Sequence, residues 1–115
     1  MREVFLLDLA DESVAAAYDA WHQPGRVPAG VLADIAGSGV RVMEIYRVAD
    51  RLVMITETTG GAPATDRVAS AASHAWERTM DPLQKPLDAA PPGVKWLAAH
   101  RIFNLADHLE TKDQA

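Results

Sequence analysis

The fold of this chain is decided by the stretch VRVMEIYRVADRLVMITET, residues 40–58. Two runs rich in β-branched and apolar residues, 40–48 and 52–58, flank the short step Ala49-Asp50. A connection this short makes antiparallel pairing the default, so the stretch predicts a β-hairpin. The alternation of side chains along a strand divides the first run between two faces. One face carries Val40, Val42, Glu44 and Tyr46, and the other carries Arg41, Met43, Ile45 and Arg47.

The residues before the hairpin predict one strand and two helical segments. Residues 4–9 form a short apolar run typical of a strand. Asp11 is a good N-cap for a helix with one apolar face, which Gln23-Pro24-Gly25 ends. Pro28 suits the first turn of a second helical segment, which ends at the glycines of residues 37–39.

The residues after the hairpin predict a helix over 66–79 and a last strand from about 95 to 105. Between them, four prolines fall within residues 82–92, which excludes a regular helix or a central strand. A long excursion of this kind suits a lid or a rim over a site. The element order approaches βαββαβ, so we expect an α+β fold with helices on one face of an antiparallel sheet.

That sheet has a second face on which apolar residues remain. Ile45, Ile55, Ile102 and Phe103 include side chains that the helix-covered face alone cannot hide. A homodimer that packs sheet on sheet would cover them.

Composition limits the range of functions. The 115 residues form one domain, which we place at 1–109 with a polar C-terminal tail at 110–115. The chain has no cysteine, so disulfides, thiolate zinc sites and a cysteine nucleophile are excluded. A net charge of −5 without a basic cluster argues against nucleic acid. Apolar runs are too short for a membrane span, and Asp8 interrupts the only stretch that resembles a signal peptide, so we expect a cytoplasmic protein.

Two residues at the end of the first helix could exchange protons. Tyr18 and His22 are four positions apart and therefore share one helix face. A phenol beside an imidazole is a suitable acid/base pair, because imidazole gives and takes protons near neutral pH. The alternative interpretation places Tyr18 in the core and His22 on the surface.

Glu44 and Trp76 each allow two interpretations. Glu44 lies among apolar neighbours in mid-strand, so it faces either solvent or a cavity in which it needs a partner. Trp76 offers a flat ring that can stack on a sugar, or it packs in the core. His100 and Asn104, with His22 and Glu44, do not match any known metal-ligand spacing, so we expect neither metal nor cofactor.

The order of these motifs resembles the L-rhamnose mutarotase family over about residues 2–105. The resemblance rests on Tyr18-x3-His22 with the prolines that follow, the strand Glu44-Ile45-Tyr46, the hairpin at residues 50–52, Trp76 with Met80, and a final apolar strand at 101–103. It implies a ferredoxin-like domain that dimerises through its sheets as a dimeric α/β barrel. It also implies that His22 is the general acid/base, that Tyr18 binds the sugar beside it and that Trp76 forms part of the pocket wall.

Two positions that contact the sugar in that family differ here. Met43 stands where the rhamnose enzymes usually have tyrosine, and Glu77 stands where they have a second tryptophan. Residues 79–84, together with Glu44, look more like the branch associated with L-fucose. The resemblance therefore implies a mutarotase for a 6-deoxy-L-hexose, L-fucose or L-rhamnose, in which Glu44 or Tyr18 is the second proton carrier.

Two other classes remain open on the residues alone. One is a non-catalytic dimeric α/β barrel that binds a small ligand or a partner. The other is a ferredoxin-like oxygenase or metal-dependent enzyme that uses His22, His74 or His100.

Overall fold

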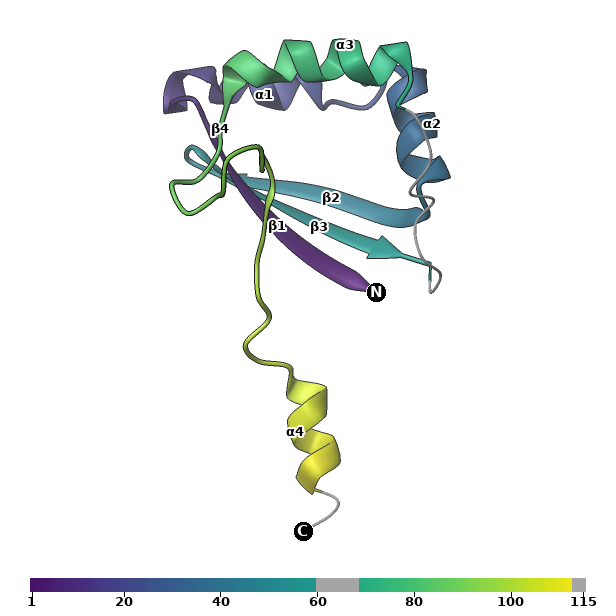
Figure 1. Cartoon of the computed structure of the whole chain (residues 1–115), viewed down its shortest axis with the longest axis vertical. Coiled ribbons are helices and arrows are strands. Elements are labelled where there is room, and N and C mark those ends of the chain that lie inside the picture. The colour runs from purple at the N-terminus through teal and green to yellow at the C-terminus, as the bar shows by residue number, and fades with distance from the viewer. Residues whose placement is uncertain (60–68, 113–115) are drawn as a thin grey trace.

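The computed structural model describes residues 1–59 and 69–112 and has helices on one face of an antiparallel sheet (Figure 1). The fold is therefore α+β, as the sequence predicts. The strands are β1 (Arg2–Leu9), β2 (Val40–Val48), β3 (Arg51–Thr58), β4 (Gln84–Lys85) and β5 (Leu97–Ala98). The helices are α1 (Ala15–Trp21), α2 (Ala29–Gly37), α3 (Ala71–Met80) and α4 (Leu105–Lys112), with 3₁₀ turns η1 (Glu12–Val14) and η2 (Asp81–Leu83).

The sheet is ordered β2-β3-β1-β4, and β5 pairs with the same edge of β1 as β4 does. The predicted hairpin is present, with Ile45 opposite Met54 and Tyr46 opposite Val53. Ala49 in its turn has φ of 51°, a left-handed conformation that is unfavourable for a residue with a Cβ. The antiparallel pairing of β2 and β3 continues up to Val48 and Arg51, so the two residues between them must reverse the chain direction.

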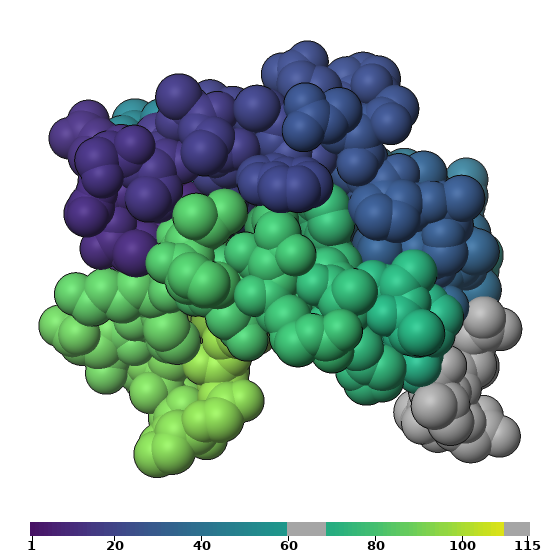
Figure 2. Space-filling view, turned by 90° about the horizontal axis from the view of Figure 1, so that it is seen from above, coloured from purple at the N-terminus to yellow at the C-terminus, as the bar shows by residue number. Residues whose placement is uncertain are grey.

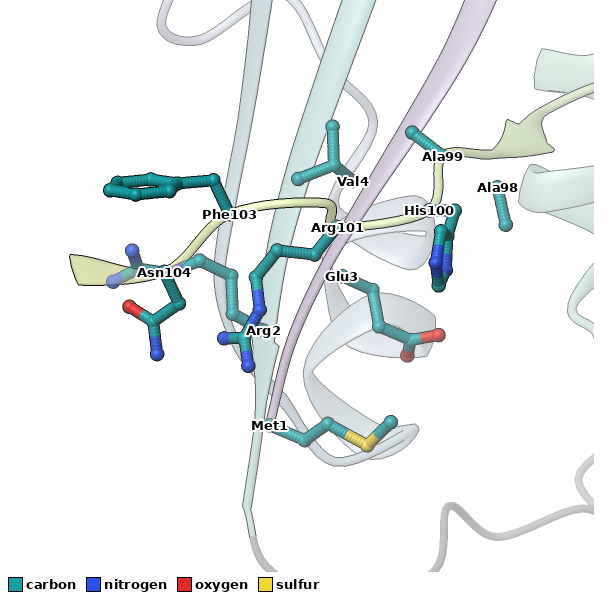
Figure 3. Close-up of a pocket in the computed structure, with 10 residues that line it drawn as sticks. All are labelled: Met1, Arg2, Glu3, Val4, Ala98, Ala99, His100, Arg101, Phe103 and Asn104. Atoms are coloured by element: carbon teal, nitrogen blue, oxygen red, sulfur yellow. The ribbon is translucent and has the colours of Figure 1, made fainter. Parts of the chain in front are cut away.

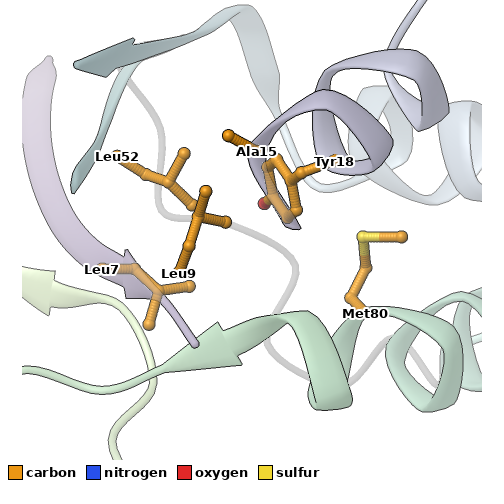
Figure 4. Close-up of a cluster of buried hydrophobic side chains, with 6 residues drawn as sticks. All are labelled: Leu7, Leu9, Ala15, Tyr18, Leu52 and Met80. Carbon is orange, nitrogen blue, oxygen red and sulfur yellow. The ribbon is translucent and has the colours of Figure 1, made fainter. Parts of the chain in front are cut away.

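A small core joins the first strand to the first helix (Figure 4). Leu7, Leu9 and Leu52 point from the sheet toward the helices and have almost no exposed surface. Tyr18 from α1 and Met80 from α3 pack against them, and both are buried. Burying side chains of this size contributes roughly 1.5–3 kcal/mol each, so this cluster holds α1 and α3 onto the sheet.

The helices α1, α2 and α3 lie on one side of the sheet (Figure 1), and the atoms of these segments adjoin one another in the view from above (Figure 2). Asp34 of α2 connects two of them, because its carboxylate accepts hydrogen bonds from the backbone N–H and the hydroxyl of Ser70 and from the hydroxyl of Ser73. Ser70 is the N-cap of α3, and its own hydroxyl accepts from the Ser73 N–H. The predicted start of this helix at residue 66 lies outside the described residues, and Ser70 fixes the start at Ala71.

The prediction of a last strand over 95–105 is wrong in its length. Only Leu97 and Ala98 pair with β1, and the Ala99 N–H makes one further bond to the Val4 carbonyl. The chain then leaves the edge of β1 before it pairs with Arg2 or Glu3, and α4 follows at Leu105–Lys112 (Figure 1). We call residues 99–112 the C-terminal arm. The expected domain boundary at residue 110 falls inside α4.

Candidate functional site

A hollow lies between the helices and β2, and the predicted residues Tyr18, His22, Met43 and Trp76 line it. It consists of two adjoining spaces of about 290 and 300 Å³ that share six residues. The shared residues are His22, Val31, Ile35, Met43, Ile45 and Trp76. Each space is near the lower limit of about 300 Å³ that small-molecule sites occupy, so the hollow has room for a ligand of monosaccharide size.

His22 is held in one orientation by the helix that precedes it. It is the C-cap of α1, and its Nδ1 lies 2.7 Å from the backbone carbonyl oxygen of Tyr18. A carbonyl oxygen only accepts, so Nδ1 carries the ring proton and donates it. The neutral imidazole therefore keeps an unprotonated Nε2, which is the atom that can remove a proton from a ligand.

Aromatic rings support the imidazole on two sides. The Tyr18 ring lies 4.4 Å from the His22 ring, centroid to centroid, at an angle of 31°. Trp76 meets the imidazole edge-on at 5.3 Å, and Trp21 meets Trp76 edge-on at 6.1 Å. These contacts restrict the movement of the imidazole at the edge of the hollow.

Tyr18 is both a core residue and a lining residue of the hollow. Its two interpretations from the sequence, as a core residue and as part of an acid/base pair with His22, are therefore compatible. Only 3% of its surface is exposed, yet it lines the hollow next to His22. Burial raises the pKa of the Tyr18 phenol, and a hydrogen bond from the Gln84 side-chain amide partly offsets that rise. The phenol therefore stays protonated at neutral pH and can act as a proton donor.

The structure does not bring Glu44 into this hollow. Met43 and Ile45 face the helices, and strand alternation turns Glu44 to the opposite face of the sheet. There its carboxylate accepts a hydrogen bond of 3.2 Å from the Tyr46 hydroxyl, which raises the pKa of that phenol. The expectation of a shared site with His22 is therefore corrected.

Glu77 lines the hollow at its far end, where it pairs with a lysine that the sequence patterns do not single out. Lys95 Nζ lies 2.6 Å from Glu77 Oε2 and also binds Asp81. Burial lowers the pKa of Lys95, but the bonds to Asp81 and Glu77 raise it by more. The ammonium thus fastens residue 95, after the proline-rich stretch, to α3 and to η2.

Sequence reasoning missed several lining residues. Val31 and Ile35 come from α2, Gln84 lies within the proline-rich stretch and Trp96 follows it. The apolar pattern of residues 29–37 predicts Val31 and Ile35 as core residues and does not predict that they line a site. Gln84 and Trp96 reach the hollow because β4 and β5 both pair with β1, a long-range arrangement that spacing along the chain does not reveal.

A larger hollow, about 630 Å³, lies elsewhere, between the first residues of β1 and the C-terminal arm (Figure 3). His100, one of the histidines considered for a metal, lines it together with Arg101 and Phe103. His22 lines the other hollow, so the two histidines do not share a site. Within residues 1–59 and 69–112, no group of three His, Asp or Glu side chains is arranged to hold a metal ion. Helices long and apolar enough to cross a membrane are likewise absent from these residues.

Comparisons with known proteins agree on one family. The family model for L-rhamnose mutarotase matches residues 2–105. An L-fucose mutarotase from Xanthomonas campestris pv. campestris is 38% identical over 112 residues, which cover 92% of this chain and 89% of that protein. The crystal structure of an L-rhamnose mutarotase from Formosa agariphila superposes with a TM-score of 0.67 at 15% identity and covers 90% and 97% of the two chains. That last likeness supports the fold alone.

Proposed function

Because this chain belongs to the L-rhamnose mutarotase family and is an isomerase of sugar anomers, we propose that its substrate is a 6-deoxy-L-hexose, L-fucose before L-rhamnose. The relative named as an L-fucose mutarotase supports the order of preference, since its similarity extends over most of the chain. Met43 and Glu77 support it as well, because both line the hollow at positions where this chain differs from the rhamnose enzymes. The proposed substrate-binding residues are Tyr18, Met43, Trp76 and Glu77.

The observation that carries the proposal is the pairing of a base with an acid in one hollow. His22 is held through Nδ1, which makes Nε2 the acceptor of the neutral imidazole, while the buried Tyr18 hydroxyl keeps its proton. In the proposed reaction Nε2 removes the proton from the C1 hydroxyl as Tyr18 protonates the ring oxygen. The C1–O5 bond breaks and leaves the open aldehyde. Rotation about C1–C2, followed by the same proton transfers in reverse, closes the ring as the other anomer.

Only protons move in this scheme, so no cofactor takes part. Each positioned proton transfer is worth about 10²–10⁴-fold in rate. Trp76 supplies an apolar ring against which the C–H groups of a sugar, including a 6-methyl group, can pack. The apolar side chains of Val31 and Ile35 line the same hollow and would keep water from the aldehyde.

Proton NMR saturation transfer between the anomers tests the choice of sugar. The C1 proton of one anomer of L-fucose is saturated, and the loss of signal at the other anomer is followed with and without the protein. The experiment is repeated with L-rhamnose and with D-glucose as a control. We expect exchange to be fastest for L-fucose, slower for L-rhamnose and unchanged for D-glucose. Faster exchange of L-rhamnose would overturn the preference, and no exchange of either deoxy sugar would favour a non-catalytic binding domain.

The proposed assembly is a ferredoxin-like homodimer in which the open faces of two sheets meet. Three features of the described residues support it. The face away from the helices exposes Val42, Tyr46 and Val48. The C-terminal arm exposes Ile102 and most of Phe103, whose ring stacks on His108 of α4. The radius of gyration is 16.5 Å, against about 13 Å for a compact chain of this length, which reflects the arm.

A further inference from the structure

Gln84 connects the sheet edge to the Tyr18 phenol. It is the first residue of β4, and its pairing with Leu9 fixes its backbone against β1. From there its side chain reaches the hollow, where Nε2 donates to the Tyr18 Oη across 3.2 Å. The two residues are 66 positions apart in the chain, so this contact depends on the tertiary fold.

The direction of that hydrogen bond determines where the phenol proton points. In this orientation of the amide its N–H donates to the Tyr18 oxygen, so the phenol hydrogen points elsewhere. In the part of the chain that the structure describes, this hydroxyl makes no second hydrogen bond. Its hydrogen is therefore available to a ligand in the hollow that Tyr18 lines.

The other end of the same amide gives independent support. Gln84 Oε1 is buried and has no hydrogen-bond partner among the described residues. Leaving a buried acceptor unpaired costs about 1–3 kcal/mol, a cost that methionine or leucine would avoid at this position. A glutamine that keeps an unpaired buried oxygen at this cost needs an explanation, and the hydrogen bond from its N–H to Tyr18 offers one.

We propose that Gln84 is a positioning residue that makes the Tyr18 hydroxyl a proton donor toward the sugar ring oxygen. The inference rests on the proposed function, because it assigns the acid of the same reaction. An acceptor in place of the amide would attract the phenol proton and turn it away from the hollow. The amide donor is therefore the feature that matters, rather than the polarity or size of the side chain.

Two substitutions separate these properties. Gln84→Met keeps the length of the side chain and removes both the donor and the unpaired oxygen. We expect it to fold normally and to lower kcat about tenfold, the equivalent of one hydrogen bond, with KM nearly unchanged. Gln84→Glu offers an acceptor instead, so we expect a larger loss at neutral pH that lessens at acidic pH relative to wild type, as the new carboxylate gains a proton and can donate. Gln23→Met, at an exposed position beyond α1, is the matched control.

A readout without sugar distinguishes failure of this inference from failure of the proposed function. The chain has two tyrosines, so the absorbance of phenolate in a Tyr46→Phe background reports the titration of Tyr18 alone. Because the Gln84 bond lowers the Tyr18 pKa, Gln84→Met should move this titration to higher pH. An unchanged titration would overturn the inference whatever the rate does. A shifted titration with a wild-type kcat would also overturn it, because the bond would then not serve the reaction.

Discussion

At the scale of single residues, the proposed reaction depends on which atoms hold protons before the sugar enters. The backbone carbonyl of Tyr18 fixes the His22 proton on Nδ1, so one residue orients the base through its main chain and supplies the acid through its side chain. Both lie toward the end of α1, where a spacing of four residues brings the two rings within 4.4 Å of each other, centroid to centroid. This local arrangement explains why the sequence alone predicts the pair.

Tyr18→Phe tests the acid. It keeps the ring that packs in the core and stacks on His22, and it removes only the hydroxyl. We expect the anomer exchange rate to fall by about 10²–10⁴-fold, the usual contribution of one proton transfer. The free energy of unfolding should fall by about 1–3 kcal/mol, because the buried Gln84 amide loses its acceptor. Saturation-transfer rates and urea unfolding measure the two effects.

Glu44→Gln is the matched control for that experiment. Glu44 faces away from the hollow and binds Tyr46, so its substitution should change the exchange rate by no more than about twofold, since surface changes remote from a site have small effects. A loss comparable to that of Tyr18→Phe would show that Glu44, rather than the phenol, is the second proton carrier.

At the scale of elements, the position of α2 depends on a close approach to α3. A Cβ built on Gly30 would lie 2.7 Å from the Cβ of Ala72, closer than real Cβ atoms approach. The Cβ of Ala72 is attached directly to the backbone, so it cannot move aside without a shift of α3. Glycine at this position therefore allows α2 to bring Val31 and Ile35 to the hollow.

Gly30→Ala should destabilise the fold by about 1–3 kcal/mol through overpacking, partly offset by the better helix propensity of alanine. Denaturant unfolding measures the change. In the double variant with Ala72→Gly, removal of the Ala72 methyl restores the space. The double variant should therefore lose less free energy of unfolding than the two single variants together. Strictly additive effects would contradict the close-packing argument.

At the scale of elements, sequence patterns predict the central hairpin but not the end of the chain. Alternation and a short turn predict β2 and β3, and the structure confirms the hairpin. The predicted division of β2 into two faces holds from Val42 onward, whereas a register shift between Val40 and Val42 interrupts the alternation at the start of the strand. The end of the chain is different, because residues 95–105 have strand-like composition but only Leu97 and Ala98 find a partner edge. Pairing depends on what lies nearby in space, so neither the short β5 nor the approach of Gln84 to Tyr18 follows from local sequence.

At the scale of the whole molecule, the two faces of the sheet have different roles. Helices cover one face and form the hollow, while the other face and the C-terminal arm expose apolar side chains. Monomers rarely expose large contiguous apolar patches, which is the physical reason to propose a second copy there. The position of Glu44 on this open face places it at the proposed interface instead of the site.

Val42→Lys should weaken the dimer, because it introduces a charge on the open face of β2. Val94→Lys is a matched control, since Val94 lies in the loop after the proline-rich stretch and the two valines are 37% and 36% exposed. Sedimentation velocity measures the oligomeric state of each variant. We expect the first variant to dissociate at concentrations where wild type and the second remain dimeric. A wild-type protein that sediments as a monomer would contradict the assembly.

The most direct test of the central claim is the anomer exchange of L-fucose by wild type and His22→Ala, measured side by side by saturation transfer. Circular dichroism should show the same fold in both, because His22 is only partly buried at the end of α1. We predict exchange above the uncatalysed rate for wild type and a loss of about 10²–10⁴-fold in the variant. A folded His22→Ala protein that exchanges the anomers as fast as wild type would contradict the assignment of the reaction to this hollow.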